Sequence, residues 1–403
     1  MINEDESEDG IVEEELEGLC EAALVDPVAI IRQRLDRPHK GTFVGSGKVE
    51  EITALAADVE ADLVLIDGEV SGMQQRNLEE AFGRKVVDRT QLILDIFARR
   101  ARTREGMLQV ELAQLTYMMP KLMAVYTKFE RQKGGIGMRG PGETKLESDK
   151  RLVRDRIARL KNEIEDVKRV REQQRSTRRK NPFPFASIVG YTSAGKSTLM
   201  NRMAGTDVLV DAMPFATLDP TTRKVDLPDG YSMFLTDTVG FIRNLPTHLV
   251  AAFRSTLEET IHSDFVLHVV DVSHPAWEMQ HSAVLETLHD LNADTKPTIT
   301  IYNKIDAADP SVRRLVGEGE KNVAISALTG EGIDELMTLI RAQVQDLLGF
   351  VRALVPYSEG GLVQQSHDYG RVHKVEYRDD GIYIEAELVA EMRNLLAKYA
   401  VPA

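Results

Sequence analysis

The chain has 403 residues, of which 42% are hydrophobic, and it carries 50 Lys and Arg against 64 Asp and Glu, a net charge of -14. This length exceeds what one hydrophobic core usually serves, so we expect several domains. No apolar run approaches the roughly 18 residues of a membrane helix, and no leader with an apolar core opens the chain, which argues against a membrane span and a secretory signal. The single cysteine, Cys20, cannot form an internal disulfide and favours a reducing compartment, the cytoplasm.

The charge is unevenly distributed along the chain. Residues 1–31 hold eleven Asp and Glu and no Lys or Arg, a composition that buries too little apolar surface to offset the entropy of ordering. We therefore predict a disordered acidic tail over residues 1–27. Residues 99–180 hold 23 Lys and Arg against 11 Asp and Glu, and the field of this region would attract phosphate groups.

Residues 28–98 show short strand-like runs among helical patterns. The strand-like runs are Leu63–Asp67 and Lys85–Val87. Between them, Ser71 is a typical helix N-cap and Gly83 a typical helix end. These signals predict a small α/β unit.

Residues 99–180 contain two helical segments whose apolar residues recur at alternating spacings of three and four. The first segment runs from Leu108 to Phe129 and the second from Val153 to Val167. This spacing is typical of a coiled-coil seam, and two such helices joined by a short break most simply pair antiparallel. The prediction is a basic helical hairpin.

The break between these helices, Arg131–Lys145, is rich in glycine. It contains Gly135-x-Gly137-x-x-Gly140, the spacing of a dinucleotide-binding loop, but such a loop requires a preceding strand, and a long helix precedes this one. We instead predict the tip of the hairpin, where glycine backbone follows an irregular RNA surface and cationic side chains contact phosphates. The predicted RNA-binding residues are Arg131, Lys133, Gly134, Gly135, Gly137, Arg139, Gly140, Gly142 and Lys145.

From residue 181 the pattern changes to strand-like apolar runs that alternate with helical stretches through residue 348. This alternation is typical of a parallel sheet covered by helices on both faces. Residues 349–403 contain further strand-like runs around an Asp-Gly turn at Asp380–Gly381, and then a helical pattern. They predict a small α+β domain.

The segment Gly190–Ser197, "GYTSAGKS", matches the phosphate-binding pattern G-x-x-x-x-G-K-[ST]. It follows a predicted strand and opens a predicted helix, which is the context that this loop requires. Glycines let backbone amides surround a β-phosphate, Lys196 offsets charge on the β and γ oxygens, and the Ser197 hydroxyl is a magnesium ligand. These residues predict a nucleotide site.

A second segment, Asn303–Asp306, identifies the base. It ends a predicted strand, where the base would lie at the carboxyl edge of the sheet. The Asp306 carboxylate can accept both the N1 and the 2-amino protons of guanine, whereas adenine would leave it unpaired. Ser326–Leu328, after the next strand, can supply backbone contacts, so guanine is predicted over adenine.

Two segments between these sites can sense the γ-phosphate. Asp237–Gly240 places a carboxylate near the magnesium ion and the Gly240 amide near the γ-phosphate, and Thr217 is predicted to be a further magnesium ligand when GTP is bound. Thr221 and Thr222 are alternatives to Thr217. Loss of the γ-phosphate would release both segments, as in the order–disorder switch of GTPases.

The fold class is α/β: a P-loop GTPase domain with a parallel-rich sheet over residues 181–348, preceded by a small α/β unit plus an antiparallel helical hairpin and followed by a small α+β domain. The predicted nucleotide-binding residues are Gly190, Tyr191, Thr192, Ser193, Ala194, Gly195, Lys196, Ser197, Thr198, Phe215, Ala216, Thr217, Leu218, Asp219, Asp237, Thr238, Val239, Gly240, Asn303, Lys304, Ile305, Asp306, Ser326, Ala327 and Leu328. Among them, Lys196, Thr217 and Gly240 are predicted to be catalytic, and Ser197, Thr217 and Asp237 to bind Mg2+, with GTP as substrate and GDP as product.

Several motifs together resemble the HflX family, within the Obg-HflX group of translation-factor-related GTPases. They are Phe215–Thr222, Asp237–Ile242, Gly134–Glu147 and Gly45–Ile52, and the resemblance extends over about residues 28 to 403. It implies binding to the large (50S) ribosomal subunit and its rRNA, near the peptidyl-transferase region, and GTP-dependent splitting or rescue of stalled ribosomes under stress. The sequence leaves the oligomeric state open, and a monomer is the working expectation.

Two residues depart from the usual GTPase pattern. Phe241 stands where many GTPases place a glutamine that orients the attacking water, which predicts slow intrinsic hydrolysis that the ribosome accelerates. Ser193 stands where HflX-like GTPases usually have an asparagine associated with potassium-assisted catalysis, which puts potassium stimulation in question. Two alternatives stay open: a GTP-gated binding or assembly module with little turnover, and an assembly GTPase like Obg or Era.

Overall fold

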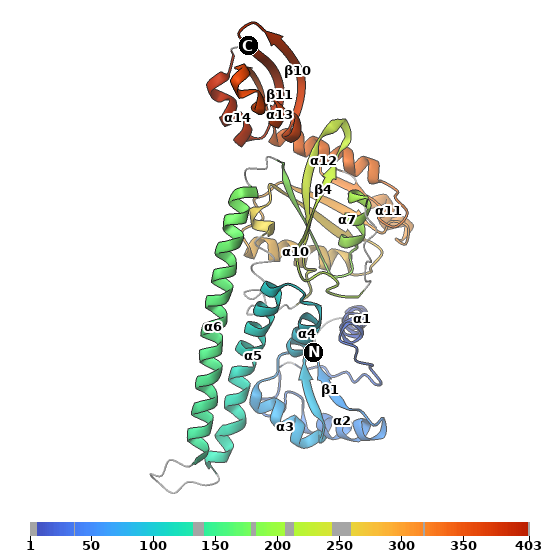
Figure 1. Cartoon of the computed structure of the whole chain (residues 1–403). Helices are drawn as coiled ribbons and strands as arrows, with labels where there is room; N and C mark the ends of the chain where they lie inside the picture. Colours follow the sequence, from blue (N-terminus) through green and yellow to red (C-terminus); the bar gives the residue numbers. More distant parts are fainter. Residues whose placement is uncertain are drawn as a thin grey trace. The chain divides into compact units, whose positions relative to one another are not determined.

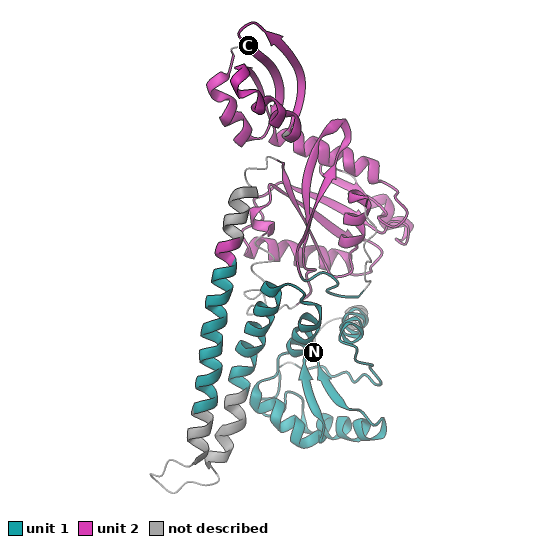
Figure 2. Cartoon of the chain, viewed as in Figure 1, with its two compact units in different colours: residues 1–167, 213–218, 244–254 teal, residues 168–212, 219–243, 255–403 magenta. Residues whose placement is uncertain are grey.

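The computed structural model describes residues 6–35, 37–131, 141–178, 183–205, 213–243, 259–316 and 319–401 (Figure 1). The chain divides into two compact units (Figure 2). Unit 1 comprises residues 1–167, 213–218 and 244–254, and unit 2 comprises residues 168–212, 219–243 and 255–403.

Unit 1 begins with helices and two parallel strands. Their bounds are α1 Glu6–Ala22, α2 Ser46–Asp58, β1 Leu63–Ile66, α3 Gly72–Phe82, β2 Lys85–Asp88 and α4 Arg89–Arg100. The predicted ends of α3 are confirmed: Ser71 forms a capping box with Gln74, and Gly83 adopts the left-handed conformation with φ 61°, which glycine tolerates at no steric cost. Leu78, Phe82 and Val86 pack in the core of this α/β region.

Helix α1 differs from the expected disordered tail over residues 1–27. At its end, Leu19, Cys20 and Ala22 are buried, and Glu15 forms an ion pair with the buried guanidinium of Arg89. The prediction rested on composition averaged over the segment, which hides a short apolar cluster at one end of an acidic helix. Packing of that cluster offsets the entropy of ordering the helix.

The predicted hairpin is confirmed in its two helices, α5 (Arg104–Arg131) and α6 (Pro141–Arg178). Leu108 on α5 packs with Leu160 and Ile164 on α6, so the predicted seam is the contact surface. Arg156 adds a bidentate contact, because its Nε and Nη2 donate to the two carboxylate oxygens of Glu111 at 2.7 Å each. The predicted tip falls largely outside the described residues, since residues 132–140 and the side chains of Arg131, Gly142 and Lys145 are not described.

A buried carboxylate fastens α5 to the α/β region within unit 1. Asp88, 1% exposed, accepts hydrogen bonds from the Lys121 Nζ at 2.6 Å, from the Gln91 amide at 2.9 Å and from the Tyr117 hydroxyl. Burial, together with the Asp88 charge, raises the pKa of Tyr117 above its ordinary value. The middle of α5 is thereby tied to the end of β2 by charge-assisted hydrogen bonds.

The main sheet lies in unit 2 and has the strand order β4-β5-β3-β6-β7-β8. All neighbouring pairs are parallel except β4 with β5, so the predicted parallel-rich sheet is confirmed. The bounds are β3 Phe185–Gly190, α7 Lys196–Ala204, β4 Thr221–Asp226, η1 Pro228–Gly230, β5 Ser232–Asp237, β6 Phe265–Asp271, α10 Trp277–Asp290, β7 Thr298–Asn303, α11 Pro310–Leu315, β8 Asn322–Ala324 and α12 Ile333–Leu347.

The two faces of this sheet differ in polarity. Leu267 and Val269 of β6 belong to the apolar core that α7 and α12 complete. Since side chains alternate along a strand, His268 points to the other face, where it stacks on His281 of α10. One face is therefore a continuous apolar core, and the other contains buried polar side chains.

The C-terminal part of unit 2 is an antiparallel sheet with the order β10-β11-β9. Its elements are β9 Gly349–Val355, η2 Tyr357–Glu359, α13 Gly360–Tyr369, β10 Arg371–Arg378, β11 Gly381–Leu388, α14 Ala390–Leu396 and η3 Ala397–Tyr399. Ile384 and Leu388 pack with Met392 and Leu396 of α14, as expected for a small α+β domain. In the described part of the chain, no helix combines the length and apolar character needed to cross a bilayer.

Candidate nucleotide-binding site

The predicted phosphate loop connects β3 to α7. Gly195 precedes α7 with φ 92°, a conformation that favours glycine. A Cβ added at Gly190 would lie 2.3 Å from the carbonyl oxygen of Val269 on the neighbouring strand, so only glycine fits there. Both glycines of the motif are therefore required by the backbone: Gly195 by its positive φ, and Gly190 by its close approach to the neighbouring strand.

Lys196 lies inside this loop. The residue is 7% exposed, and its Nζ donates to the carbonyl oxygens of Gly190 at 3.1 Å and Tyr191 at 2.6 Å. Burial lowers the pKa of Lys196 to about 8, against the opposing effect of the Asp237 charge. An ammonium group held this way is positioned to meet phosphate oxygens, whose charge would raise that pKa again.

Ser197 and Asp237, two of the predicted magnesium ligands, are adjacent. The Ser197 Oγ donates to Asp237 Oδ2 at 2.6 Å, although the two residues lie on different elements. A hydroxyl oxygen and a carboxylate oxygen are ligands that Mg2+ prefers. The donor set therefore fits the predicted ion.

Gly240 lies against the phosphate loop. A Cβ there would lie 2.9 Å from the Thr192 Cα and 3.0 Å from the Lys196 Nζ, so glycine permits this close approach. The next residue, Phe241, is 4% exposed, and its backbone exchanges hydrogen bonds with the loop, from its N to the Gly190 O at 3.0 Å and from the Thr192 N to its O at 2.7 Å. A buried phenyl ring at this position cannot orient a water molecule.

The base-recognition residues converge from three elements. Asn303, 1% exposed, donates from Nδ2 to the Ala194 O at 2.8 Å and accepts at Oδ1 from the Ala327 N at 3.0 Å. Its side chain thus links the phosphate loop to the predicted Ser326–Leu328 loop. Asp306 is exposed at the same edge of the sheet, where it is available to a ligand.

Lys304 and Asp271 form an ion pair that the sequence motifs do not predict. Lys304 has φ 64°, and its Nζ lies 2.6 Å from the Asp271 Oδ2. Asp271 ends β6, next to the strand that carries the base motif, and a carboxylate at the carboxyl end of a parallel strand is the signal that could have found it. The ion pair orients the aliphatic part of Lys304.

The predicted sensing segment around Thr217 belongs to the other unit. Met213–Leu218 clusters with unit 1, where the Phe215 ring, 3% exposed, meets the Phe97 ring of α4 edge-on at 4.6 Å between centroids. Thr217 therefore lies in unit 1, whereas Ser197 and Asp237 lie in unit 2. Its roles as a magnesium ligand and catalytic residue stay predictions.

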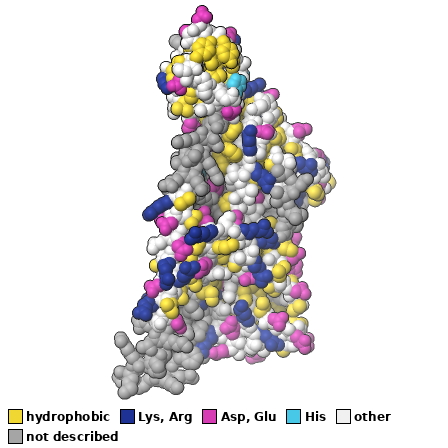
Figure 3. All heavy atoms as spheres, viewed as in Figure 1, with side chains coloured by type: hydrophobic (Ala, Val, Ile, Leu, Met, Phe, Trp, Pro, Cys, Tyr) yellow, Lys and Arg dark blue, Asp and Glu magenta, His cyan; other side chains and the backbone are white. Residues whose placement is uncertain are grey.

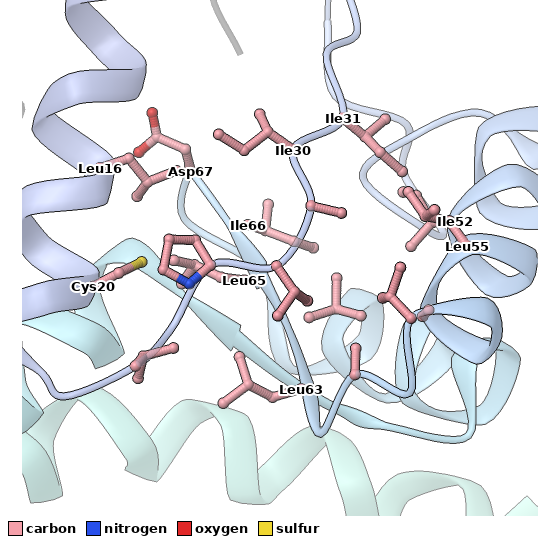
Figure 4. Close-up of a pocket in the computed structure, with 18 of the residues that line it drawn as sticks. Leu16, Cys20, Ile30, Ile31, Ile52, Leu55, Leu63, Leu65, Ile66 and Asp67 are labelled. Atoms are coloured by element: carbon pink, nitrogen blue, oxygen red, sulfur yellow. The ribbon is translucent and has the colours of Figure 1, made fainter.

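Unit 1 also contains an apolar cavity of about 650 Å³ (Figure 4). It is lined mainly by aliphatic side chains of α1, the segment after it, α2 and β1, such as Leu16, Ile30, Ile52 and Leu65. None of its lining residues belongs to the predicted nucleotide-binding set, so the cavity is not the nucleotide site.

The sheet, the glycine-shaped phosphate loop with its buried lysine, and the adjacent Ser197 and Asp237 define a P-loop GTPase. Three family models match the chain: "GTP-binding GTPase N-terminal" over residues 12–98, "GTP-binding GTPase Middle Region" over residues 100–178 and "50S ribosome-binding GTPase" over residues 185–304. The chain belongs to the GTPase HflX family. GTPase HflX of Lacrimispora saccharolytica is 49% identical over 387 residues, which cover 96% of this chain and 92% of that protein.

Two further relatives carry the same name. GTPase HflX of Caldanaerobacter subterraneus is 43% identical over 96% of this chain and 90% of its own length. GTPase HflX of Escherichia coli is 42% identical over 91% of this chain and 87% of its own length. The resemblance read from the motifs is confirmed, and the chain is an enzyme that hydrolyses GTP.

Proposed function

We propose that this GTPase binds the large ribosomal subunit through its basic hairpin, and that GTP binding controls this contact so that stalled or stressed ribosomes are split or rescued. The match of residues 185–304 to a "50S ribosome-binding GTPase" family supports the ribosome as partner. A ribosomal partner favours action in the cytoplasm.

The hairpin supplies the electrostatic part of the proposal. The surplus of Lys and Arg over residues 99–180 contrasts with the acidic remainder of the chain. Arg151, Arg154, Arg159, Lys161 and Arg169 are exposed on α6, and Figure 3 shows Lys and Arg side chains along the described part of the hairpin, interleaved with Asp and Glu. Contacts of this kind with rRNA phosphates weaken as salt rises.

The nucleotide site supplies the switch. Lys196 and the loop amides would hold the phosphates, and the Asn303 side chain links the base loop to the phosphate loop. Ser197 and Asp237 would hold Mg2+, and Thr217 stays the predicted further ligand when GTP is bound. The ion neutralises charge on the β and γ oxygens when it is bound. We propose that the chain acts as a monomer, since each of these roles is filled within one chain.

One observation favours slow intrinsic turnover: Phe241 is buried and its backbone is bonded to the phosphate loop. This chain therefore lacks a side chain that orients water at that position, and we expect purified 50S subunits to accelerate single-turnover GTP hydrolysis strongly. The same observation supports the second candidate, a GTP-gated binding module with little turnover. Equal rates with and without 50S subunits, combined with GTP-dependent binding, would favour that candidate.

The tip of the hairpin is the proposed RNA contact. Deletion of Gly134–Gly142 leaves the nucleotide site intact, so GDP affinity should be unchanged while co-sedimentation with 50S subunits and stimulation of hydrolysis are lost. Retention of both ribosome-dependent readouts by the deletion variant would refute the assignment of the tip.

A further inference from the structure

The loop that follows β8 holds its backbone amides in a fixed pattern. The Ser326 N donates to the Glu331 O at 2.9 Å, the Ala327 N to the Asn303 side chain at 3.0 Å, and the Gly330 N to the Ser326 O at 2.8 Å. The Thr329 N donates to the Ser326 Oγ at 3.1 Å. Within the described part of the chain, Leu328 is the residue of this run, 326–330, whose amide has no hydrogen-bond acceptor.

Arg202, on the helix that begins with the phosphate-binding lysine, binds the other side of this loop. Its Nε donates to the Ala327 O at 3.2 Å, and its Nη2 donates to the Leu328 O. A Cβ added at Gly330 would lie only 3.6 Å from the Arg202 Nη1, so the guanidinium lies directly against the loop backbone. The Arg202 side chain thus donates hydrogen bonds to two successive carbonyl oxygens of the loop.

Because the peptide bond is planar, the contact of Arg202 with the Ala327 oxygen also fixes the direction of the Leu328 N–H. The Ala327 carbonyl and the Leu328 amide belong to one trans peptide plane, and in such a plane the C=O and N–H point in opposite directions. When Arg202 holds the Ala327 oxygen toward α7, the Leu328 N–H must point away from α7. Because the carbonyl and the amide turn together, a rotation that redirected the Leu328 N–H would also pull the Ala327 oxygen away from Arg202.

We propose that Arg202 is a positioning residue for guanine specificity, which orients the Leu328 amide toward the 6-oxo group of the base. Guanine presents an acceptor at this position, whereas adenine presents an amino donor, so a fixed N–H favours the first and opposes the second. The inference rests on the proposed nucleotide site. It adds a residue of α7, remote in sequence from both base motifs, to the recognition of the base.

The test is a double-mutant-type cycle. One change removes the Arg202 side chain from the protein, and the other replaces the 6-oxo acceptor of the nucleotide with a weaker one. Binding of GDP and of 6-thioguanosine diphosphate, whose sulfur is a weaker acceptor, is measured by calorimetry for the native chain, Arg202→Ala and Arg202→Lys. Arg313→Ala is the matched control, because Arg313 pairs with Glu331 of the same loop and both side chains are about half exposed. The single tryptophan, Trp277, verifies by its fluorescence that each variant is folded.

We expect the native chain to prefer GDP to its 6-thio analogue. Arg202→Ala should weaken GDP binding by roughly tenfold, as expected for loss of charge-assisted hydrogen bonds that fix a donor, and should weaken analogue binding much less. Arg202→Lys should lie between these, since lysine offers a point charge without the two-pronged geometry. Arg313→Ala should leave the ratio of the two affinities at the native value.

Equal losses for both nucleotides in Arg202→Ala, no loss for either, or a native chain that does not distinguish them would each overturn the role of Arg202. If the native chain bound no guanine nucleotide at all, the nucleotide site itself would be wrong, so the two failures are distinguishable.

Discussion

The buried histidine pair of unit 2 predicts that acid destabilises this domain. His268 has an exposed fraction of 0% and stacks on His281 with 4.8 Å between ring centroids and 5° between planes. Among the described residues, neither ring nitrogen of His268 has a hydrogen-bond partner. Burial, together with the charges of His281 and Lys196, lowers the pKa of His268 from 6.5 to about 3, and burial also lowers the pKa of His281.

The sign of the effect follows from which state binds more protons. Below its ordinary pKa of 6.5, His268 is protonated in the unfolded chain but stays neutral in the folded one. Stability is therefore lost as pH falls from 6.5 toward 3. At 1.36 kcal/mol for each pH unit in this window, His268 alone should cost about 2 kcal/mol between pH 7 and pH 5.

The measurement is urea unfolding at pH 7 and at pH 5. Trp277 is the single tryptophan and packs edge-on against Tyr302, with 6.0 Å between ring centroids, so its fluorescence reports on unit 2. With a slope of roughly 2 kcal/mol per molar urea, the unfolding midpoint of the native chain should fall by about 1 M.

The variant His268→Leu is the control, because it keeps the side-chain volume and removes the titrating ring. The urea midpoint of His268→Leu should fall by much less between pH 7 and pH 5. The fall that remains in this variant comes from the carboxylates and His281. An equal fall for the native chain and for His268→Leu would refute the reasoning.

Three further predictions concern the nucleotide site. Asn303→Ala leaves two buried backbone groups without partners, at about 1–3 kcal/mol each, so GDP affinity measured by calorimetry should fall at least tenfold; unchanged affinity would show that Asn303 does not link the loops. Asp237→Asn should raise the Mg2+ concentration for half-maximal hydrolysis by roughly 10-fold or more, and an unaltered magnesium titration would exclude Asp237 from the metal site. Hydrolysis by the native chain should be equal in potassium and sodium, whereas Ser193→Asn should be faster in potassium, because the asparagine associated with potassium-assisted catalysis is restored; potassium stimulation of the native chain would show that Ser193 does not remove this dependence.

Much of the fold could be predicted because its signals are local. Strand β3, which leads into the phosphate loop, is a short apolar run, Ser71 and Gly83 mark helix ends by their own backbone chemistry, and the hairpin seam repeats at a fixed spacing. The phosphate loop is equally local, since Gly190, Gly195 and Lys196 lie within a few residues of one another.

The remaining features depend on contacts between distant segments. Arg202 of α7 bonds to a loop that follows β8, far along the chain. His268 stacks on His281 only because α10 packs against β6. The sequence does not predict helix α1 because its apolar end is stabilised by packing within unit 1 and not by its own composition. The sequence shows which residues are present, but it does not show which residues from distant segments meet in the folded chain.

The central claim is that GTP binding makes this chain act on the ribosome. Its most direct test is sedimentation of 70S ribosomes with the protein in the presence of GTP, GDP or a non-hydrolysable GTP analogue. The account predicts separate 50S and 30S subunits with GTP and with the analogue, and intact 70S ribosomes with GDP. Intact 70S ribosomes in all three nucleotide states would contradict it.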